Sequence, residues 1–387
     1  MWPDSPLQRR LAAHLSRWEH DGLLRTLRSP AGIDLSSNDY LGLARDRRLV
    51  DAFQAAAASD GVGSTGSRLL GGHRQTFAEI ERRFARFKGV DQALYFSSGY
   101  LANLAVLTTL TEPGDLIFSD ALNHASLIDG IRLSRARRIV VPHADVDRFA
   151  EAIRTEPCAG IRFVVVESVF SMDGDVAPLD RLADVCREFE AVLVVDEAHA
   201  VGLLGPGGAG LVNASSVGDV PCVSINAAGK ALGVSGAFVA GPALIVEFLT
   251  QRARPFVFST APTPAVAAAI DASLTIVQDE PERRERTLSN ATYLRRRLRA
   301  AGIAVPESPS PIIPVHIGEN EPATRVANSL QARGFDVRAI RPPSVPPGTA
   351  RLRLSINAGL STETLDQVVE ALAVTLQEAG LCSAVSS

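Results

Sequence analysis

The chain has 387 residues, of which 46% are hydrophobic and 21% are charged, and its formal net charge is −4. This length allows a large and a small domain, and the composition is that of an ordinary globular protein. A slightly acidic chain gives no reason to expect binding to nucleic acid or to an anionic membrane surface. The N-terminus lacks a basic-then-apolar signal pattern, and no stretch approaches a membrane span. We therefore expect a cytoplasmic protein of enzyme size.

The cysteines show neither paired spacing nor the spacing of metal ligands. They are Cys158, Cys186, Cys222 and Cys382. We expect separate thiols in a reducing compartment, with no disulfide and no metal site.

The first elements in chain order are a helix, a turn, a second helix and a glycine-rich loop. Leu, Arg and Ala recur with helical periodicity from about Pro6 to Leu27. Leu35 to Leu43, L-S-S-N-D-Y-L-G-L, predicts a short strand and a turn, and a helix is expected at 47–59. The stretch from Gly61 to His73 allows the backbone to approach a ligand closely; a flexible linker is the alternative, which Arg68 and His73 make less convincing.

From Thr76 onward, strand and helix patterns alternate along the chain. Helical stretches separate most of the strands, which predicts an α/β fold with a mostly parallel sheet and helices on both faces. The strands are expected near Ala93–Phe96, Leu116–Ser119, Arg138–Val141, Phe163–Glu167, Val192–Asp196, Val223–Ile225 and Ala237–Ala240.

A proline-rich segment from Pro306 to Pro311 predicts a domain boundary. Long helical patterns precede it at Pro264–Asp279 and Arg283–Ala301. The elements expected after it form a small α+β domain: Ile312–Ile317, Ala323–Gly334, Val337–Ile340, Leu352–Ile356 and a last helix at Glu363–Ala379. We therefore expect an N-terminal helix and strand segment (1–45), a large domain (46–305) and a small C-terminal domain (306–387).

Lys230 lies within a run of small and apolar residues from Ser224 to Phe238. Desolvation lowers the pKa of a lysine and frees its amine for Schiff-base chemistry, although a plain surface lysine is the commoner case. Asp196 follows a continuous apolar run that predicts a buried parallel strand, so it lies at the edge where open α/β sheets bind ligands. A lysine for an aldehyde and an aspartate for a pyridinium nitrogen are what a protein contributes to a pyridoxal phosphate (PLP) site.

Further candidates follow other strands. Ser98, Gly99 and Tyr100 lie in a turn from a strand into a helix, where free N–H groups suit a phosphate. Tyr100 is equally suited to packing at the helix start. His124 opens a helix on the same sheet edge as Asp196, which favours stacking on a flat cofactor over a purely structural histidine.

Three more polar side chains are candidates for contacts to a cofactor or substrate. Ser168 follows an apolar strand, where it meets a cofactor or simply caps a loop. His199, three residues after Asp196, is placed to hydrogen-bond a phenolic oxygen. Arg341 precedes two prolines and carries a guanidinium that fits a carboxylate at two points, although a surface arginine needs no function.

These motifs, in this order, resemble those of the α-oxoamine synthases, PLP enzymes of the aspartate-aminotransferase fold (fold type I). The resemblance runs from about Ser36 to Ser355 and rests on S-S-N-D-Y-L-G-L, S-S-G-Y-x-A-N, N-H-A-S-L, E-S-V-F-S-M-D-G-D, V-D-E-A-H and G-K-A-L-G-V-S-G. Within the family, the segment from Ile340 to Leu354 looks most like the member that joins L-alanine to a pimeloyl thioester in biotin synthesis. The sequence leaves open whether coenzyme A or acyl carrier protein bears the thioester.

The resemblance implies a role for each candidate residue. Lys230 would bind the cofactor aldehyde and remove the alanine α-proton, Asp196 would keep the ring nitrogen protonated, and His124 would stack on the ring and assist the reaction. His199 would contact a ring substituent of the cofactor and take part in catalysis with these residues. The other implied contacts are to the cofactor from Ser98, Gly99, Tyr100 and Ser168, to its phosphate from Ser259 and Thr260 of a neighbouring subunit, and to the substrate from Asn38, Arg341 and Ser344. A homodimer with sites at the subunit interface follows from the resemblance.

Three positions depart from the family pattern. Ala227, three residues before Lys230, replaces a Thr or Ser that bonds the phosphate, which removes a contact worth roughly 1.5–3 kcal/mol. Ala200 replaces the glycine that normally follows D-E-A-H. The arginine that meets the substrate near the N-terminal helix has no clear match, since Leu24 lies near its place with Arg25 next to it.

Two alternatives stay open at this point. One is another member of the family, such as a glycine C-acetyltransferase, a 5-aminolevulinate synthase or an enzyme of the serine palmitoyltransferase type. The other is a PLP-binding paralogue with little catalysis, which has Ala227 in its favour and the intact Lys230, Asp196, His124 and His199 against it. An NAD-dependent dehydrogenase is excluded because no G-x-G-x-x-G turn follows a first strand.

Overall fold

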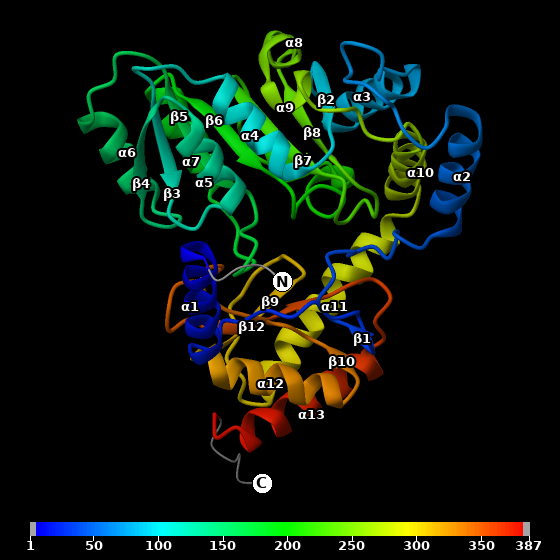
Figure 1. The fold of residues 1–387 in the computed structure, drawn as a ribbon, viewed down its shortest axis with the longest axis vertical. Coiled ribbons are helices and arrows are strands. Elements are labelled where there is room, and N and C mark those ends of the chain that lie inside the picture. The colour runs from blue at the N-terminus through cyan, green and yellow to red at the C-terminus, as the bar shows by residue number, and fades with distance from the viewer. Residues whose placement is uncertain (1–4, 382–387) are drawn as a thin grey trace. The chain divides into compact units, whose positions relative to one another are not determined.

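The computed structural model describes residues 5–381 and divides into two compact units. The large unit consists of Asn38–Ser171 and Asp175–Thr287, and the terminal unit combines residues 5–37, Met172–Gly174 and residues 288–381 (Figure 1). The sequence suggested domain boundaries at 45/46 and 305/306. In the structure, the N-terminal segment instead groups with the C-terminal one in a single unit. Cys382 and the outer ends of the two expected terminal segments lie outside the described residues.

The large unit is built on a seven-stranded sheet with the strand order β2-β8-β7-β6-β5-β3-β4. β8 runs antiparallel to both of its neighbours, and every other pair is parallel. The strands are β2 (Gln92–Phe96), β3 (Leu116–Asp120), β4 (Arg137–Val141), β5 (Arg162–Glu167), β6 (Val192–Asp196), β7 (Cys222–Ala227) and β8 (Ala237–Gly241). The expected α/β fold with a mostly parallel sheet is therefore confirmed.

Helices cover both faces of this sheet (Figure 1). Alternate residues of one strand enter different cores: Phe163 and Val165 of β5 pack on one face, and Val164 and Val166 pack on the other. This is why the central strands are apolar throughout. The first face is covered by α4 (Gly99–Thr109), α5 (Ala125–Leu133), α8 (Ala243–Arg252) and α9 (Arg254–Val257), and the second by α6 (Val146–Thr155) and α7 (Leu179–Glu188).

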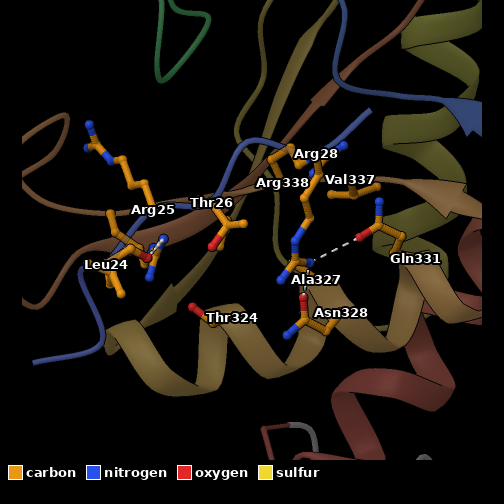
Figure 2. Close-up of a pocket in the computed structure, with 12 residues that line it drawn as sticks. Leu24, Arg25, Thr26, Arg28, Thr324, Ala327, Asn328, Gln331, Val337 and Arg338 are labelled. Carbon is orange, nitrogen blue, oxygen red and sulfur yellow. Dashed lines mark hydrogen bonds between the residues drawn. The ribbon is translucent and has the colours of Figure 1, made fainter. Parts of the chain in front are cut away.

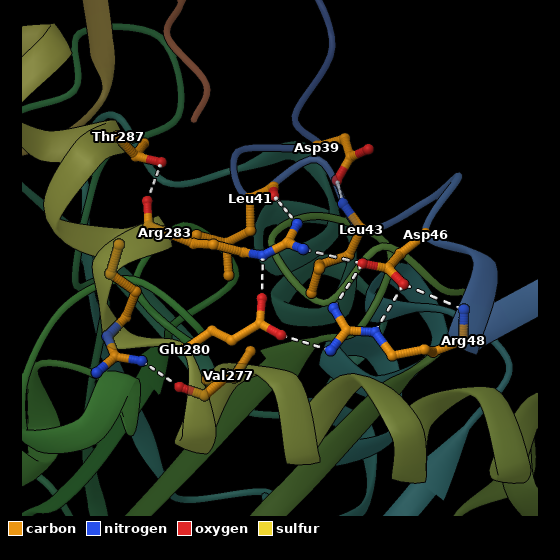
Figure 3. Close-up of polar contacts among 10 residues, drawn as sticks. Asp39, Leu41, Leu43, Asp46, Arg48, Val277, Glu280, Arg283 and Thr287 are labelled. Carbon is orange, nitrogen blue, oxygen red and sulfur yellow. Dashed lines mark hydrogen bonds and ion pairs between the residues drawn. The ribbon is translucent and has the colours of Figure 1, made fainter. Parts of the chain in front are cut away.

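An ion-pair network holds the segment before α2 (Arg47–Asp60) in the large unit (Figure 3). Asp46 caps α2 and accepts hydrogen bonds from Arg48 and Arg283, whose guanidinium also reaches the carbonyl of Leu41 at 3.2 Å. Glu280 pairs with both arginines. The hydrogen bond from Arg48 lowers the pKa of Asp46 to about 2. The remaining α-helices of this unit are α3 (Gln75–Lys88) and α10 (Ala265–Asp279), and α11 (Pro281–Ala300) begins in it.

The terminal unit is a small α+β structure, as expected. Its antiparallel sheet has the order β11-β12-β9, and β1 pairs in parallel with β10. The elements are α1 (Pro6–His20), β1 (Ile33–Asp34), β9 (Ile312–Gly318), α12 (Asn320–Ala332), β10 (Phe335–Asp336), β11 (Ala339–Ile340), β12 (Ala350–Ser355) and α13 (Thr362–Glu378). Apolar residues of α11, α12, α13 and the strands form its core.

Two sequence predictions in this unit needed correction. The first helix ends at His20, well before Leu27, because Gly22 adopts a φ of 65° that stops the helix. The expected strand at Val337–Ile340 is two short strands, because β10 pairs with β1 whereas β11 pairs with β12. Among residues 5–381, the helices are all too short or too polar to cross a membrane.

Candidate functional site

Lys230 lies in the turn between β7 and β8 and contacts the ring of His199. Its Nζ is 2.8 Å from His199 Nε2, and Nδ1 of the same ring is 2.8 Å from the hydroxyl of Tyr40. That hydroxyl donates to Oδ1 of Asn38 at 3.0 Å. Since the Tyr40 proton points to Asn38, His199 Nδ1–H donates to Tyr40 and leaves Nε2 to accept from the lysine. Three predicted site residues, Lys230, His199 and Asn38, are thus joined through Tyr40, to which the sequence assigned no role.

Asp196 ends β6, and both of its carboxylate oxygens accept hydrogen bonds. Oδ2 accepts from Nδ2 of Asn103 at 2.7 Å, and Oδ1 accepts from the backbone N–H of Ala198 at 2.9 Å. A carboxylate at this strand end is the group that pairs with a pyridinium nitrogen.

His124 is the N-cap of α5, and Ser126 donates to it. Nδ1 of His124 is 2.7 Å from the Ser126 hydroxyl and accepts from the Ser126 N–H at 3.2 Å. Burial lowers the pKa of His124; the charge of Asp196 opposes this shift, and the charge of Lys230 adds to it. The ring is therefore neutral at neutral pH, and it lies close to both predicted catalytic charges.

Glu167 ends β5 beside Asp196, its partner in the sheet register. Burial and the nearby Asp196 charge raise the pKa of Glu167 to about 8, against an opposing effect of Lys230. Its Oε2 accepts from the N–H of Ser171 at 3.2 Å. In the sequence, this glutamate appears within the E-S-V-F-S-M-D-G-D motif, and its position at the end of an apolar strand is the signal that could have identified it.

The start of α4 provides free donors near residue 227. Ser98 caps this helix by accepting from Leu101 N–H at 3.3 Å, whereas the N–H groups of Gly99 and Tyr100 have no acceptor within a helix. A methyl group placed on Gly99 would lie 3.8 Å from Cβ of Ala227. Ala227, where the resemblance places a Thr or Ser, therefore offers no side-chain hydroxyl beside the N–H groups of Gly99 and Tyr100. The Tyr100 hydroxyl donates to Asp129 at 2.5 Å.

The remaining predicted cofactor residues make mainly backbone contacts. Ser168 is buried; its N–H donates to the carbonyl of Asp196 at 2.9 Å, and its hydroxyl donates to the same oxygen at 3.4 Å. Thr260 pairs with Ser67 of the glycine-rich loop, and the hydroxyl of Ser259 donates to the Thr260 carbonyl at 3.4 Å. Ser259 and Thr260 therefore lie against that loop.

Arg341 and Ser344, the two predicted substrate residues after Asn38, belong to the terminal unit. Arg341 donates to the carbonyls of Gly22 and Leu24, and Arg25 donates to the Ser344 hydroxyl at 3.5 Å. Burial and the charge of Arg25 lower the pKa of Arg341. Both arginines line a pocket of about 260 Å³ with Leu24, Thr26, Arg28, Thr324, Ala327, Asn328, Gln331, Val337, Arg338 and Ala339 (Figure 2). Arg25 thus shares a pocket with Arg341. It lies next to Leu24, the position near which the family resemblance placed a substrate-binding arginine.

The residues of the large unit fit PLP. An amine, a carboxylate held by two hydrogen bonds, a neutral histidine and a helix start with free N–H groups match its aldehyde, ring nitrogen, ring face and phosphate. In the part of the chain that the structure describes, no group of three or more His, Cys, Asp or Glu side chains is placed to hold a metal ion.

Comparison with protein families identifies the chain's relatives. The model of the aminotransferase class I and II family matches residues 30–372. The chain belongs to this family. Its cofactor is PLP, as expected from the sequence, and the fold type I architecture is confirmed.

Curated relatives and solved structures agree with the resemblance to the α-oxoamine synthases. A putative 8-amino-7-oxononanoate synthase of Geobacillus kaustophilus is 42% identical over 95% of both chains, and an 8-amino-7-oxononanoate synthase of Methylococcus capsulatus is 46% identical over 88% of both. A serine palmitoyltransferase from S. paucimobilis has a TM-score of 0.91 at 29% identity, over 98% of this chain and 100% of that one. An 8-amino-7-oxononanoate synthase from Francisella tularensis has a TM-score of 0.77 at 29% identity, over 90% and 98%.

Proposed function

We propose that this protein is a PLP-dependent acyltransferase that condenses L-alanine with a pimeloyl thioester. The products are 8-amino-7-oxononanoate, carbon dioxide and the free thiol, and the reaction belongs to biotin synthesis. Relatives with that name are 42–46% identical over about nine-tenths of the chain. The contact between Lys230 and His199, together with the hydrogen-bonded Asp196 carboxylate at the end of β6, is the structural observation that supports catalysis by this chain.

Bound PLP supplies an electron sink that stabilises negative charge on the amino-acid carbon. Four parts of the large unit would hold it. Lys230 binds its aldehyde, Asp196 its ring nitrogen, His124 its ring face, and the N–H groups of Gly99 and Tyr100 its phosphate. Ser98 caps the helix that presents those N–H groups, and Ser168 and His199 contact the ring substituents.

The protein's own groups then hold and transfer protons at the site. The amine of Lys230 acts as the base toward the alanine α-proton, and Nε2 of His199, 2.8 Å away, accepts a hydrogen bond from that amine. Tyr40, His199 and Asp196 are buried, so their hydrogen bonds act in a low dielectric where they are stronger than in water. The neutral His124 ring presents an apolar face that does not repel a pyridinium.

Substrate and partner contacts complete the proposal. Asn38 lies within the Lys230 hydrogen-bond chain, and Arg341 with Ser344 carries the charge suited to a substrate carboxylate. The active form is a homodimer in which Ser259 and Thr260 reach the cofactor phosphate of the neighbouring subunit. Either coenzyme A or acyl carrier protein bears the acyl group. A cytoplasmic location remains a prediction from the sequence.

The test is an absorbance scan of the purified protein with PLP, followed by separate additions of L-alanine, glycine and L-serine. A cofactor band that shifts with L-alanine alone, together with release of thiol from pimeloyl-CoA, supports the proposal. A shift with serine alone favours the serine palmitoyltransferase type, whose solved structures match this fold at a TM-score of 0.91. No cofactor band at all would leave the weakly catalytic paralogue.

A further inference from the structure

We propose that Asn103 and Ser126 are positioning residues that couple Asp196 to His124. Asn103 binds the Asp196 carboxylate and the Ser126 hydroxyl at once, and Ser126 determines which ring nitrogen of His124 carries the proton. The inference rests on the proposed function, since that function gives Asp196 and His124 their roles at the cofactor. The hydrogen bonds among Asn103, Asp196, Ser126 and His124 involve only protein groups and do not depend on a bound cofactor.

The side-chain amide of Asn103 is held in one orientation. It is buried, and its Nδ2 lies 2.7 Å from Asp196 Oδ2 and 2.8 Å from Ser126 Oγ, so both N–H bonds are used. Its buried Oδ1 has no hydrogen-bond partner among the described residues. The flipped amide would place this oxygen against a carboxylate oxygen, with two acceptors facing each other. The Asp196 carboxylate therefore fixes the direction of the amide.

That direction determines the proton position on Ser126. Because Ser126 Oγ accepts from Asn103, its own proton is free to point at Nδ1 of His124, 2.7 Å away. The Ser126 N–H points at the same nitrogen from 3.2 Å. With two donors directed at Nδ1, the neutral ring carries its proton on Nε2. The chain of donors runs in one direction, from Asn103 through Ser126 to His124.

The coupling solves an electrostatic problem at this end of the sheet. The charged and titratable groups facing His124 are Asp196 at the end of β6, Glu167 at the end of β5 and Lys230 in the β7–β8 turn. The negative charge of Asp196 favours a proton on His124, which would turn the ring into a cation beside a pyridinium. The two donors of Ser126 oppose protonation of Nδ1, so the His124 ring stays neutral beside the Asp196 carboxylate.

The experiment reads the His124 ring directly, in the full-length chain with PLP bound and after its removal. A long-range ¹H–¹⁵N spectrum distinguishes the tautomers, and its pH titration gives the pKa of the ring; His124→Gln assigns the signal. We expect an Nε2–H ring in the wild type. In Ser126→Ala and in Asn103→Ala we expect a mixture of tautomers and a higher pKa, with kcat about tenfold lower and KM little changed. Ser126→Thr keeps the hydroxyl and should show the wild-type tautomer, ring pKa and kcat.

Asn123 supplies the matched control. It is also buried, its Nδ2 also donates twice, to Ser119 and to the carbonyl of Val165, and its Oδ1 is also without a partner among the described residues. Asn123→Ala should cost similar stability and leave the Nε2–H ring intact. Should Asn103→Ala fail to fold, Ser126→Ala against Ser126→Thr decides the matter. An unchanged tautomer and pKa in Ser126→Ala overturns the inference, whichever substrates the enzyme accepts; rejection of alanine by an enzyme whose tautomer does respond overturns only the proposed function.

Discussion

Nζ of Lys230 lies 2.8 Å from Nε2 of His199, although the two residues come from different loops at the carboxyl edge of the sheet. The nitrogen that faces the lysine is the acceptor of the ring, because the other nitrogen donates to Tyr40. An amine that donates to a buried imidazole keeps its direction, and a base must keep its direction to act on one proton of a substrate.

Replacing this lysine should abolish the reaction. We expect Lys230→Ala to lower kcat by about 10³-fold or more, because neither the covalent link to the cofactor aldehyde nor the base remains. The absorbance band of the lysine-bound cofactor should disappear in the same variant. Lys230→Arg, which keeps the charge, should be equally inactive. Turnover retained by either variant would remove Lys230 from the mechanism.

The hydroxyl of Tyr40 should matter to activity more than to stability. Tyr40→Phe keeps the buried ring but removes the acceptor of His199 Nδ1–H, so we expect kcat to fall about tenfold and the free energy of unfolding to fall by about 1 kcal/mol. Tyr95→Phe is the control, because that buried hydroxyl donates to the carbonyl of Ser235 at 2.8 Å and is absent from the Lys230 hydrogen-bond chain. Steady-state kinetics and denaturant titration measure both quantities. Equal kcat values for the two variants would contradict the role of Tyr40.

A hydroxyl at position 227 should tighten cofactor binding. Ala227 lies beside the start of α4, so Ala227→Thr adds a donor next to the N–H groups of Gly99 and Tyr100. We expect the Kd for PLP to fall about tenfold or more, from a gain of roughly 1.5–3 kcal/mol. Ala227→Val has the same shape without the hydroxyl and should not tighten binding. Equal Kd values for Thr and Val in an equilibrium titration with PLP would show that the phosphate is held elsewhere.

The stability of the large unit should depend on the charge of His143. Nδ1 and Nε2 of this ring lie 2.9 Å from Asp120 and 2.7 Å from Asp175. Burial alone would lower the pKa of His143, but hydrogen bonds to the two carboxylates raise it from 6.5 to about 10. Since the pKa is higher in the folded state, the charged ring stabilises fully below about pH 6.5, and this stabilisation is lost as the pH rises through about 10.

Comparison with His143→Gln isolates this contribution. The variant cannot be charged, so its deficit in free energy of unfolding should be largest near pH 6 and should shrink toward about pH 10. Denaturant titrations of both proteins across this range provide the measurement. A deficit that stays constant with pH would mean that the ring is not charged in the folded protein.

Much of the fold follows from the sequence because local patterns and tertiary packing agree. The apolar runs of β5 and β6 are buried on both faces, so their hydrophobicity alone marks them as central parallel strands. Asp196 was predicted as a site residue for the same reason, since it ends such a strand, whereas Lys230 was predicted from the small and apolar residues around it. The end of α1 was missed because Gly22 stops the helix before its apolar periodicity fades.

The supporting residues of the site could not be identified in this way. Tyr40 is separated from His199 by 159 positions, and Asn103 is separated from Asp196 by 93. Their roles come from hydrogen bonds that exist only after the sheet has formed, so no local spacing indicates them. The sequence contained these residues within quoted motifs, but it did not indicate which side chains they bind.

The composition of the terminal unit has a consequence for protein synthesis. β1 pairs with β10, and the unit also takes in Met172–Gly174, so its parts are made at the start, middle and end of translation. The large unit, from Asn38 to Thr287, leaves the ribosome earlier. We therefore expect co-translational folding to begin with the seven-stranded sheet. The nascent β1 segment has no strand partner until β10 has emerged from the ribosome, and during this time it is accessible to chaperones.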